Sequence, residues 1–260
     1  MRLAGKVILV TGSTTGIGEA MARLFVEEGA LVMVHGLHSS DAPGVAAELG
    51  DKAGFVSGDL ADPATPARVI AAALEQLGRL DCIVNNAAAV TRGNLENTQL
   101  ADFDRTLAVN LRAPFLLIQA ALPHFLQHGG GRVLNIGSIN SYCGEANQLA
   151  YSISKGGLTT LTRNLADAHG PNGIRVNQLN VGWTLTANEF QLKQTEGLSS
   201  DWPSKLPTVF APSGRLLSPR EVAWAAVYFL SDEAALVNGA VVDLEQYPVI
   251  GRNPRKETRN

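Results

Sequence analysis

Short apolar runs alternate with longer amphipathic stretches along most of the chain. Because consecutive positions in the short runs are apolar, and many are β-branched or leucine, the runs are typical of strands that helices cover on both faces. This alternation predicts an α/β fold, a doubly wound sheet of about seven parallel strands with helices on both faces. The predicted strands are residues 7–11, 31–35, 53–56, 82–85, 132–136, 175–180 and 240–244, and the predicted helices lie at about 17–28, 64–77, 100–127, 151–169 and 219–230.

Residues 186–218 form the one long segment that departs from this alternation. The segment contains Trp202, Pro203, Pro207 and Pro212 and has no strong periodicity. In a compact domain such a segment is usually a lid or a binding loop, and it can contain short helices. Because it follows the sixth predicted strand, we expect it at the carboxyl edge of the sheet, where ligands bind in this class of fold.

Length and composition favour a single domain over residues 1–260. The chain has 260 residues, of which 45% are hydrophobic, and a chain of this size buries roughly three quarters of its unfolded surface in one core. No low-complexity linker divides it. A short basic tail at about 248–260 is expected to fray or to pack on a neighbouring subunit.

Charge and hydropathy argue against nucleic acids and membranes as partners. The formal net charge is -3 and the pI is near 6.0, so no broad basic face is expected. Apolar runs such as 7–10 and 31–34 are far shorter than the ~20 residues of a membrane-spanning helix. Without a charged, apolar and small-residue leader at the N-terminus, the protein is expected to be cytoplasmic.

The cysteines and paired histidines predict neither a disulfide nor a metal site. Cys82 and Cys143 lack C-x-x-C spacing and are expected to be reduced and packed. His124 and His128 share a helical face, but two imidazoles without a carboxylate or cysteine partner make a poor metal site.

A glycine-rich loop directly follows the first predicted strand. Gly12 permits a tight turn, Gly16 lets the backbone approach a pyrophosphate, and Gly18 lets the next helix pack closely. The start of that helix then faces the phosphates. Glycine-rich turns between a strand and a helix also occur for packing reasons alone, so this motif by itself leaves both interpretations open.

Tyr151 and Lys155 are four residues apart in a predicted helix. That spacing places both side chains on one helical face, about 6 Å apart along the axis. The lysine ammonium can then favour the tyrosine phenolate. The pair predicts an enzyme that moves a proton while a dinucleotide moves a hydride.

Seven motifs, in this order and spacing, resemble the short-chain dehydrogenase/reductase family over about residues 3–245. They are Thr11-Gly-x3-Gly-x-Gly18, Asp59-Leu60, Asn85-Asn86-Ala87-Ala88, Asn110, Ser138, Tyr151-x3-Lys155 and Val181-Gly182-x3-Thr186. The resemblance is nearest to the 3-hydroxybutyrate dehydrogenase and sugar-alcohol dehydrogenase branches. It implies a Rossmann-type fold and an NAD(P)-dependent enzyme that interconverts a secondary alcohol and a ketone.

The resemblance also implies roles for four catalytic residues. Tyr151 would be the general acid/base, and Lys155, with the positive nicotinamide of the oxidised cofactor, would lower its pKa. Lys155 would also bond the nicotinamide ribose, Ser138 would steady the substrate oxygen, and Asn110 would hold a water that links Lys155 to solvent. The structural alternative makes Tyr151 a buried aromatic, Ser138 a turn residue and Asn110 a helix kink, and it needs four coincidences of type and spacing.

The cofactor-binding residues follow from the same resemblance. Asp59 would bond the adenine amino group, although it could equally cap the next helix, for which Asp62 is the better candidate. Two departures, Ala88 in place of glycine and Val181 in place of proline, leave the shape of the nicotinamide pocket open. The complete predicted set is Gly12, Thr14, Thr15, Gly16, Ile17, Gly18, Gly36, Leu37, His38, Asp59, Leu60, Asn86, Ala87, Tyr151, Lys155, Gly182, Thr184 and Thr186.

The end of the second strand is where the choice between NAD and NADP is usually made. An acid there holds the ribose 2′-hydroxyl of NAD, but residues 34–40 contain neither Asp nor Arg. His38, Ser39 and Ser40 could still bind a 2′-phosphate through neutral hydrogen bonds. Gly36-Leu37 resembles the Gly-Phe of NAD-using 3-hydroxybutyrate dehydrogenases, and on that basis NAD is favoured over NADP.

The predicted substrate is a small polar secondary alcohol such as a sugar, a polyol or a hydroxy acid. The 3-hydroxybutyrate branch recognises a carboxylate with His and Lys, where this chain has Asn140 and Gln148. Neutral amides suit hydroxyl-rich or amide-bearing ligands, although they could instead serve only the loop backbone. The predicted substrate-binding residues are Ser138, Asn140, Gln148, Tyr151 and Trp183.

Two other functions and an oligomeric state complete the predictions. The alternatives are a 3-oxoacyl thioester reductase and a non-catalytic dinucleotide-binding sensor, although sensors typically lose the acid/base pair that this chain keeps. Apolar positions on more than one side of the helix near Phe115 indicate a protein partner. Family resemblance implies a homodimer or a homotetramer.

Overall fold

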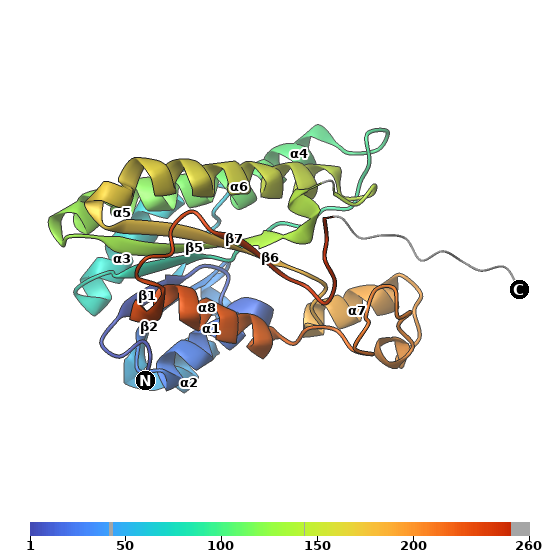
Figure 1. The fold of residues 1–260 in the computed structure, drawn as a ribbon, viewed down its shortest axis with the longest axis horizontal. Helices are drawn as coiled ribbons and strands as arrows, with labels where there is room; N and C mark the ends of the chain where they lie inside the picture. Colours follow the sequence, from blue (N-terminus) through green and yellow to red (C-terminus); the bar gives the residue numbers. More distant parts are fainter. Residues whose placement is uncertain (42–43, 143, 251–260) are drawn as a thin grey trace, which may run out of the picture.

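A seven-stranded parallel sheet forms the centre of the structure (Figure 1). The structure is a computed structural model that describes residues 1–41, 44–142 and 144–250. The strand order is β3-β2-β1-β4-β5-β6-β7, and every neighbouring pair is parallel. All seven predicted strands are confirmed to within about two residues at their ends. The strands are β1 (Val7–Val10), β2 (Leu31–Gly36), β3 (Ala53–Ser57), β4 (Cys82–Asn85), β5 (Gly131–Ser138), β6 (Ile174–Val181) and β7 (Val241–Leu244).

Helices cover both faces of the sheet, which confirms the predicted doubly wound Rossmann-type fold (Figure 1). One face carries α1, α2 and α8, and the other carries α3, α4, α5 and α6. The helices are α1 (Gly16–Glu27), α2 (Val45–Leu49), α3 (Thr65–Leu77), α4 (Leu100–Leu107), α5 (Ala113–Gln127), α6 (Leu149–His169), α7 (Ala187–Thr195) and α8 (Pro219–Leu230).

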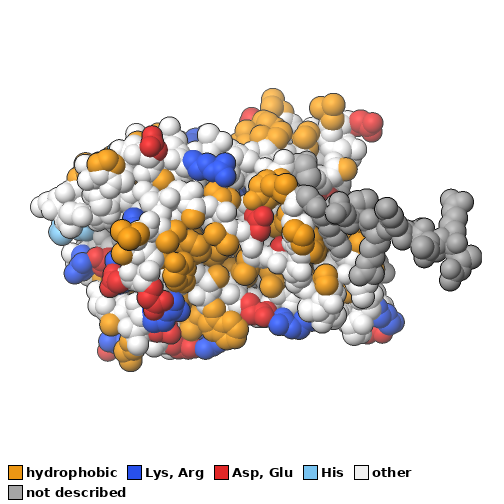
Figure 2. Space-filling model, viewed as in Figure 1, with side chains coloured by type: hydrophobic (Ala, Val, Ile, Leu, Met, Phe, Trp, Pro, Cys, Tyr) orange, Lys and Arg blue, Asp and Glu red, His pale blue; other side chains and the backbone are white. Residues whose placement is uncertain are grey.

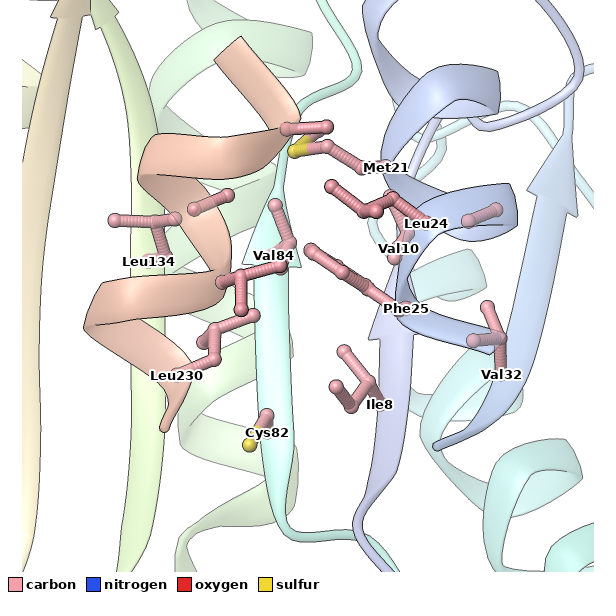
Figure 3. Packing of buried hydrophobic residues seen from close by; sticks show 14 of the residues in the cluster. Ile8, Val10, Met21, Leu24, Phe25, Val32, Cys82, Val84, Leu134 and Leu230 are labelled. Carbon is pink, nitrogen blue, oxygen red and sulfur yellow. The ribbon is translucent and has the colours of Figure 1, made fainter. Parts of the chain in front are cut away.

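Two hydrophobic clusters fill the layers between the sheet and its helices. Because strand side chains alternate between the two faces, Ile8 and Val10 belong to the cluster under α1 and α8, whereas Leu9 belongs to the opposite cluster. Figure 3 shows the first cluster, in which Phe25 of α1 and Leu230 of α8 pack over β1 and β4. Both faces of the central strands are therefore buried, as their continuous apolar sequence predicts.

The predicted helix at 100–127 contains a break that sequence periodicity did not reveal. Ala108–Arg112 is a π-helical turn between α4 and α5. The whole stretch Leu100–Gln127 is long and apolar enough to cross a bilayer by length and composition alone, a test that a core helix also passes. Its most apolar window is 50% buried, and α5 packs on α3 and β5, which accounts for its apolar character.

The 186–218 segment has more regular structure than a loop. It contains α7 and a 3₁₀ turn at Trp202–Ser204, and it lies beside the carboxyl edge of the sheet (Figure 1). The carboxyl ends of β1 and β4, where the strand order reverses, form the crevice in which doubly wound folds bind ligands. Most of the predicted basic tail and Cys143 lie outside the described residues.

Candidate active site

The glycine-rich loop has the geometry that its sequence predicts. Gly12 and Gly16 both have φ of +60°, which L side chains rarely adopt. A Cβ on Gly18 would lie 2.2 Å from the carbonyl oxygen of Gly12 and 2.5 Å from the Asn86 amide nitrogen, so only glycine allows α1 to pack this closely. Gly12 and Gly18 therefore serve the tight turn and the close packing that were predicted for them.

Side chains from two neighbouring strands hold this loop in place. Asn86 donates through its side-chain amide to the carbonyl oxygens of Thr11 (2.9 Å) and Gly12 (3.0 Å). Thr11 Oγ1 accepts hydrogen bonds from the backbone N–H groups of Asn86 and Ala87, both at 3.0 Å. The predicted Asn86-Ala87 segment thus supports the loop directly.

His35, which the sequence analysis did not assign, is a second support for the loop. Its Nδ1 lies 3.2 Å from the backbone nitrogen of Gly12, and its Nε2 lies 3.1 Å from the carbonyl oxygen of Gly58. The first contact needs an acceptor and the second a donor, so the ring is neutral with its proton on Nε2. Burial lowers the pKa of His35 and favours this neutral form.

The start of α1 meets the beginning of the 186–218 segment. No side chain among the described residues caps the N-terminus of α1, which begins after Thr15, so its first N–H groups remain available to an anion. A Cβ on Gly16 would lie 3.5 Å from Thr186 Cγ2, and Thr186 Oγ1 caps α7 by accepting from the N–H of Glu189. This arrangement fits the pyrophosphate of a dinucleotide, because the glycine-rich turn and the uncapped N-terminus of α1 lie opposite the segment that begins at Thr186.

The remaining predicted cofactor residues lie in varied surroundings. Ile17 and Leu60 pack into the two hydrophobic clusters, whereas Leu37 and His38 are exposed after β2, and Thr14 touches the Cβ position of Gly36. Gly182 follows β6, and its carbonyl oxygen accepts a hydrogen bond from the hydroxyl of Thr184 at 3.1 Å.

Asp59 has partners that the sequence analysis did not foresee. Its carboxylate pairs with Arg105 at 2.9 Å and accepts a hydrogen bond from the N–H of Ala61. The bond to Arg105 is the main reason that its pKa lies below the ordinary value. Asp62, predicted as the better cap, accepts from the N–H of Ala64 and the hydroxyl of Thr65 where α3 begins.

Tyr151, Lys155 and Ser138 lie together at the carboxyl end of β5. Tyr151 and Lys155 come from the first two turns of α6, and Ser138 is the last residue of β5. The Ser138 hydroxyl is near enough to the Tyr151 hydroxyl to lower its pKa, and Lys155 Nζ lies 5.5 Å from the centre of the Tyr151 ring. The predicted juxtaposition of phenol, ammonium and hydroxyl is present.

Burial controls the protonation of this cluster. It raises the pKa of Tyr151, and the hydrogen bond from Ser138 only partly opposes it. Burial also lowers the pKa of Lys155 to about 8. The sequence prediction, that Lys155 and the oxidised nicotinamide together favour the phenolate, concerns the enzyme with its dinucleotide and stays a prediction. Lys155 Nζ donates to the carbonyl oxygen of Ile136 at 2.7 Å.

Asn110 occupies the π-helical turn and is connected to α6. Its side chain exchanges hydrogen bonds with the backbone of Ala89 and donates to Ser154 Oγ at 3.0 Å. Ser154 in turn donates to the carbonyl oxygen of Tyr151 at 2.6 Å. Asn110 therefore lies in a helix irregularity, as its structural alternative supposed, and is also connected to the Tyr151 helix. Ser154 is a supporting residue that the sequence motifs did not reveal.

Asn140 and Gln148 form a neutral amide pair in the loop between β5 and α6. Asn140 Nδ2 donates to Gln148 Oε1 at 3.1 Å, and the N–H of Asn140 donates to Ser138 Oγ at 3.1 Å. The pair is thereby linked to Ser138. The Gln148 side chain is buried, and its remaining Nε2 donors together with Asn140 Oδ1 offer both polarities of hydrogen bond.

Trp183 packs against a hydrophobic cluster of the 186–218 segment, which is hereafter called the lid after its predicted role. Its ring stacks on Trp202 with centres 5.6 Å apart, and its Nε1 donates to Glu189 at 2.8 Å. Arg92 extends from the loop after β4 to Glu196 of the lid (3.3 Å) and to Glu145 of the β5–α6 loop (3.8 Å). Three loops at the site are thus tied together.

The side chains of His124 and His128, which were considered as a metal site, make a hydrogen bond and a ring-stacking contact instead. His124 Nε2 accepts from the N–H of Leu80, and the rings of His124 and His128 stack 4.0 Å apart. In the described part of the chain, no group of three or more His, Cys, Asp and Glu side chains is arranged to hold a metal ion.

Comparison with known families agrees with this geometry. A family model described as enoyl-(acyl carrier protein) reductase matches residues 12–245. The chain belongs to the short-chain dehydrogenase/reductase family. It is accordingly an NAD(P)-dependent enzyme that acts on CH–OH groups.

Several characterised members of the short-chain dehydrogenase/reductase family are similar along nearly their whole length. D-threitol dehydrogenase of Mycolicibacterium smegmatis is 38% identical, over 92% of this chain and 91% of that protein. L-fucose dehydrogenase of Mus musculus is 34% identical, over 92% and 86%. A 3-alpha-(or 20-beta)-hydroxysteroid dehydrogenase of Mycobacterium tuberculosis is 35% identical, over 93% and 89%.

A solved member of the family has the same fold. The crystal structure of 3-ketoacyl-(acyl-carrier-protein) reductase from Brucella melitensis, complexed with NADH, matches with a TM-score of 0.83 and 32% identity. The match covers 94% of this chain and 98% of that one.

Proposed function

We propose that this enzyme is an NAD-dependent dehydrogenase that interconverts a secondary alcohol and a ketone on a small polar substrate, such as a sugar, a polyol or a hydroxy acid. The observation that carries the choice of substrate is the neutral pair Asn140–Gln148, linked to Ser138 at the catalytic end of β5. Two neutral amides match hydroxyl groups better than they match a small anion.

In this proposal Tyr151 exchanges a proton with the substrate oxygen. The bound dinucleotide supplies the site that accepts or returns the hydride. Ser138, which lies beside the phenol, donates a hydrogen bond to the substrate oxygen and stabilises negative charge that develops on it. The buried Lys155 ammonium, with its 5.5 Å approach to the Tyr151 ring, favours the phenolate when the proton leaves.

Asn110 and Lys155 position this chemistry in the proposal. Asn110 donates a hydrogen bond to Ser154, and Ser154 donates one to the backbone carbonyl of Tyr151. The π-helical turn therefore helps to position the Tyr151 side chain. Lys155 is fixed by its bond to Ile136, one turn from the phenol. A water held at Asn110, which would connect Lys155 to solvent, stays a prediction.

The names of the relatives support a polar substrate without deciding it. D-threitol and L-fucose dehydrogenases act on a polyol and a sugar, but a steroid dehydrogenase has nearly the same identity to this chain. The 3-ketoacyl-(acyl-carrier-protein) reductase similarity keeps a 3-oxoacyl thioester reductase as the second candidate. All four catalytic positions are filled, which disfavours a sensor without turnover.

A substrate panel tests the proposal. Polyols, aldoses, hydroxy acids, a hydroxysteroid and a 3-oxoacyl thioester are each assayed with NAD(H) and NADP(H) by absorbance at the nicotinamide band. We expect NAD-linked turnover of at least one polyol, sugar or hydroxy acid. Turnover confined to the steroid or the thioester contradicts the proposed substrate class.

Two neighbouring amides provide a matched pair of variants. Gln148→Leu removes the buried amide of the pair, and we expect it to raise KM for the polar substrate about tenfold or more because a buried partner is left without its bond. Asn147→Leu changes an exposed amide next to it and should leave KM unchanged. Equal KM values for the two variants would remove Gln148 from substrate recognition.

A further inference from the structure

The segment after β2 folds back over the end of its own strand. β2 ends at Gly36, and residues Ser39–Asp41 form a short 3₁₀ turn. Asp41 Oδ2 accepts a hydrogen bond from the N–H of His38 at 3.1 Å, and the N–H of Asp41 donates to the carbonyl oxygen of His38 at 3.1 Å. These two bonds fix the carboxylate above the strand end.

The Asp41 carboxylate occupies the space that a side chain at position 36 would otherwise fill. A Cβ on Gly36 would lie 3.0 Å from Asp41 Oδ2, 3.0 Å from Asp41 Cβ and 2.9 Å from Thr14 Cγ2. In an aspartate, standard bond lengths and angles place each carboxylate oxygen about 2.4 Å from its own Cβ. The Asp41 carboxylate therefore lies directly beside position 36, within the distance that the side chain of an acid there would span.

An acid at the end of the second strand is the usual receptor of the ribose 2′-hydroxyl of NAD, and the strand sequence itself lacks one. We propose that Asp41 takes this role. The 3₁₀ turn positions its carboxylate, and Gly36, which has no side chain, leaves the space that this carboxylate occupies. The inference rests on the NAD preference of the proposed function, and it explains that preference by the carboxylate of Asp41.

The bonding state of Asp41 suits this role. Within the described ranges its side chain makes one hydrogen bond, through Oδ2, and no ion pair. Oδ1 can accept from a ribose hydroxyl, while the uncompensated negative charge repels a 2′-phosphate. Asp59, the other nearby carboxylate in the sequence motifs, is already paired with Arg105.

Direct binding of NADH and NADPH, measured by nicotinamide fluorescence and by calorimetry, tests the assignment without a substrate. We expect wild type to prefer NADH. Asp41→Asn keeps an acceptor for the N–H of His38 and removes the charge, and Asp41→Ala removes both. In both variants the ratio of Kd for NADPH to Kd for NADH should fall by about tenfold or more.

Asp51→Asn is the control for the change in net charge. Asp51 is exposed at the amino end of β3, on the opposite edge of the sheet, and its variant should keep the wild-type ratio. Melting temperatures of all variants check that the fold persists.

The outcomes separate the two proposals. A wild-type preference for NADH that Asp41→Asn and Asp41→Ala leave unchanged overturns the role of Asp41 alone. A wild-type preference for NADPH overturns the NAD assignment and the role of Asp41 with it. A ratio that falls as expected, in an enzyme that turns over no polyol, sugar or hydroxy acid, supports Asp41 and contradicts only the substrate class.

Discussion

At the scale of single residues, the site contains a buried ammonium, and its burial lowers the folding stability of the protein. Lys155 is 3% exposed, and among the described residues it has no carboxylate partner. Its pKa of about 8, lowered by desolvation, means that the folded state binds its proton less tightly than the unfolded state. Such a residue is explained by function, because burial of an unpaired charge lowers stability.

Replacing this ammonium should therefore stabilise the protein while inactivating it. Lys155→Met should raise the melting temperature at pH 7 by a few degrees, equivalent to at most about 3 kcal/mol, and abolish turnover. Between pH 8 and the pKa of Lys155 in the unfolded state, the unfolded state binds more protons, so the stability of the wild type rises with pH. The difference in melting temperature between Lys155→Met and the wild type should therefore be smaller at pH 9.5 than at pH 7. Scanning calorimetry from pH 6.5 to 9.5 measures this.

The exposed Lys52 provides the control, since Lys52→Met should change the melting temperature little at any of these pH values. A Lys155→Met protein that melts below wild type at pH 7, by a margin that is constant with pH, would contradict the idea of a costly buried charge.

Sequence predicts residues whose role depends on local spacing. The three glycines of the loop, and Ser138, Tyr151 and Lys155, are identified by their distance along the chain from a strand end or from one another, and the structure brings them together. His35 and Asp41 were missed because their partners, Gly12 and the space beside Gly36, depend on how separate segments cross. The burial of Tyr151, which raises its pKa, was not foreseen because burial cannot be judged from spacing.

At the scale of elements, the lid has a hydrophobic core of its own. Trp202, Ala211 and Leu216 are buried together, with Trp183, Leu185, Phe190 and Leu206 packed against them, and this cluster is separate from the two clusters of the sheet. The Trp202 indole N–H is buried and has no hydrogen-bond partner within residues 1–41, 44–142 and 144–250. A small, separate core with an unsatisfied donor is expected to open more readily than the sheet.

Loss of Trp202 should loosen the lid selectively. Trp202→Ala should speed amide exchange over residues 187–216 and raise KM, while exchange in β1, β4 and β5 stays at wild-type rates. Hydrogen exchange with mass spectrometry, together with steady-state kinetics, measures both effects. Leu236→Ala, which truncates a 99% exposed leucine outside the lid, is the control. Faster exchange throughout the sheet would show that the lid core is not independent.

Strands and long helices are predictable from sequence because their apolar pattern extends over whole elements. The π-helical turn at Ala108–Arg112 and the short α2 were not predicted. A π turn adds one residue to a helical repeat and leaves the apolar pattern nearly intact, and α2 spans only five residues. In the lid, the prolines and sparse periodicity predicted a loop, and tertiary packing of its aromatic residues produced α7 beside them.

At the scale of the whole molecule, two apolar surfaces are candidates for subunit contacts. A groove of about 580 Å³ between α4, α5 and α6 is lined by Leu107, Leu111, Phe115 and Leu161 among others. On another face, hydrophobic side chains gather across the middle, where α8 and the edge strand β7 lie (Figure 2). Val242 and Trp224 are exposed there at 42% and 55%. Apolar surface beside an open sheet edge favours self-association.

The predicted homodimer or homotetramer can be tested at these surfaces. Phe115→Asp places a charge in the groove and should convert the oligomer to a smaller species, as measured by light scattering at micromolar concentration. Leu198→Asp changes an exposed leucine of the lid and should leave the mass unchanged. A wild-type protein that is monomeric at these concentrations would contradict the prediction.

The most direct test of the proposed chemistry compares two tyrosine variants. Tyr151→Phe should lower kcat by about 10²–10⁴-fold on the best substrate of the panel, since it removes only the acid/base hydroxyl. Its Kd for NADH should stay within about twofold of wild type, because the phenol hydroxyl contributes little to dinucleotide binding. Tyr228→Phe, on α8, should retain wild-type turnover. Full activity in Tyr151→Phe would contradict the assignment of Tyr151 as the acid/base.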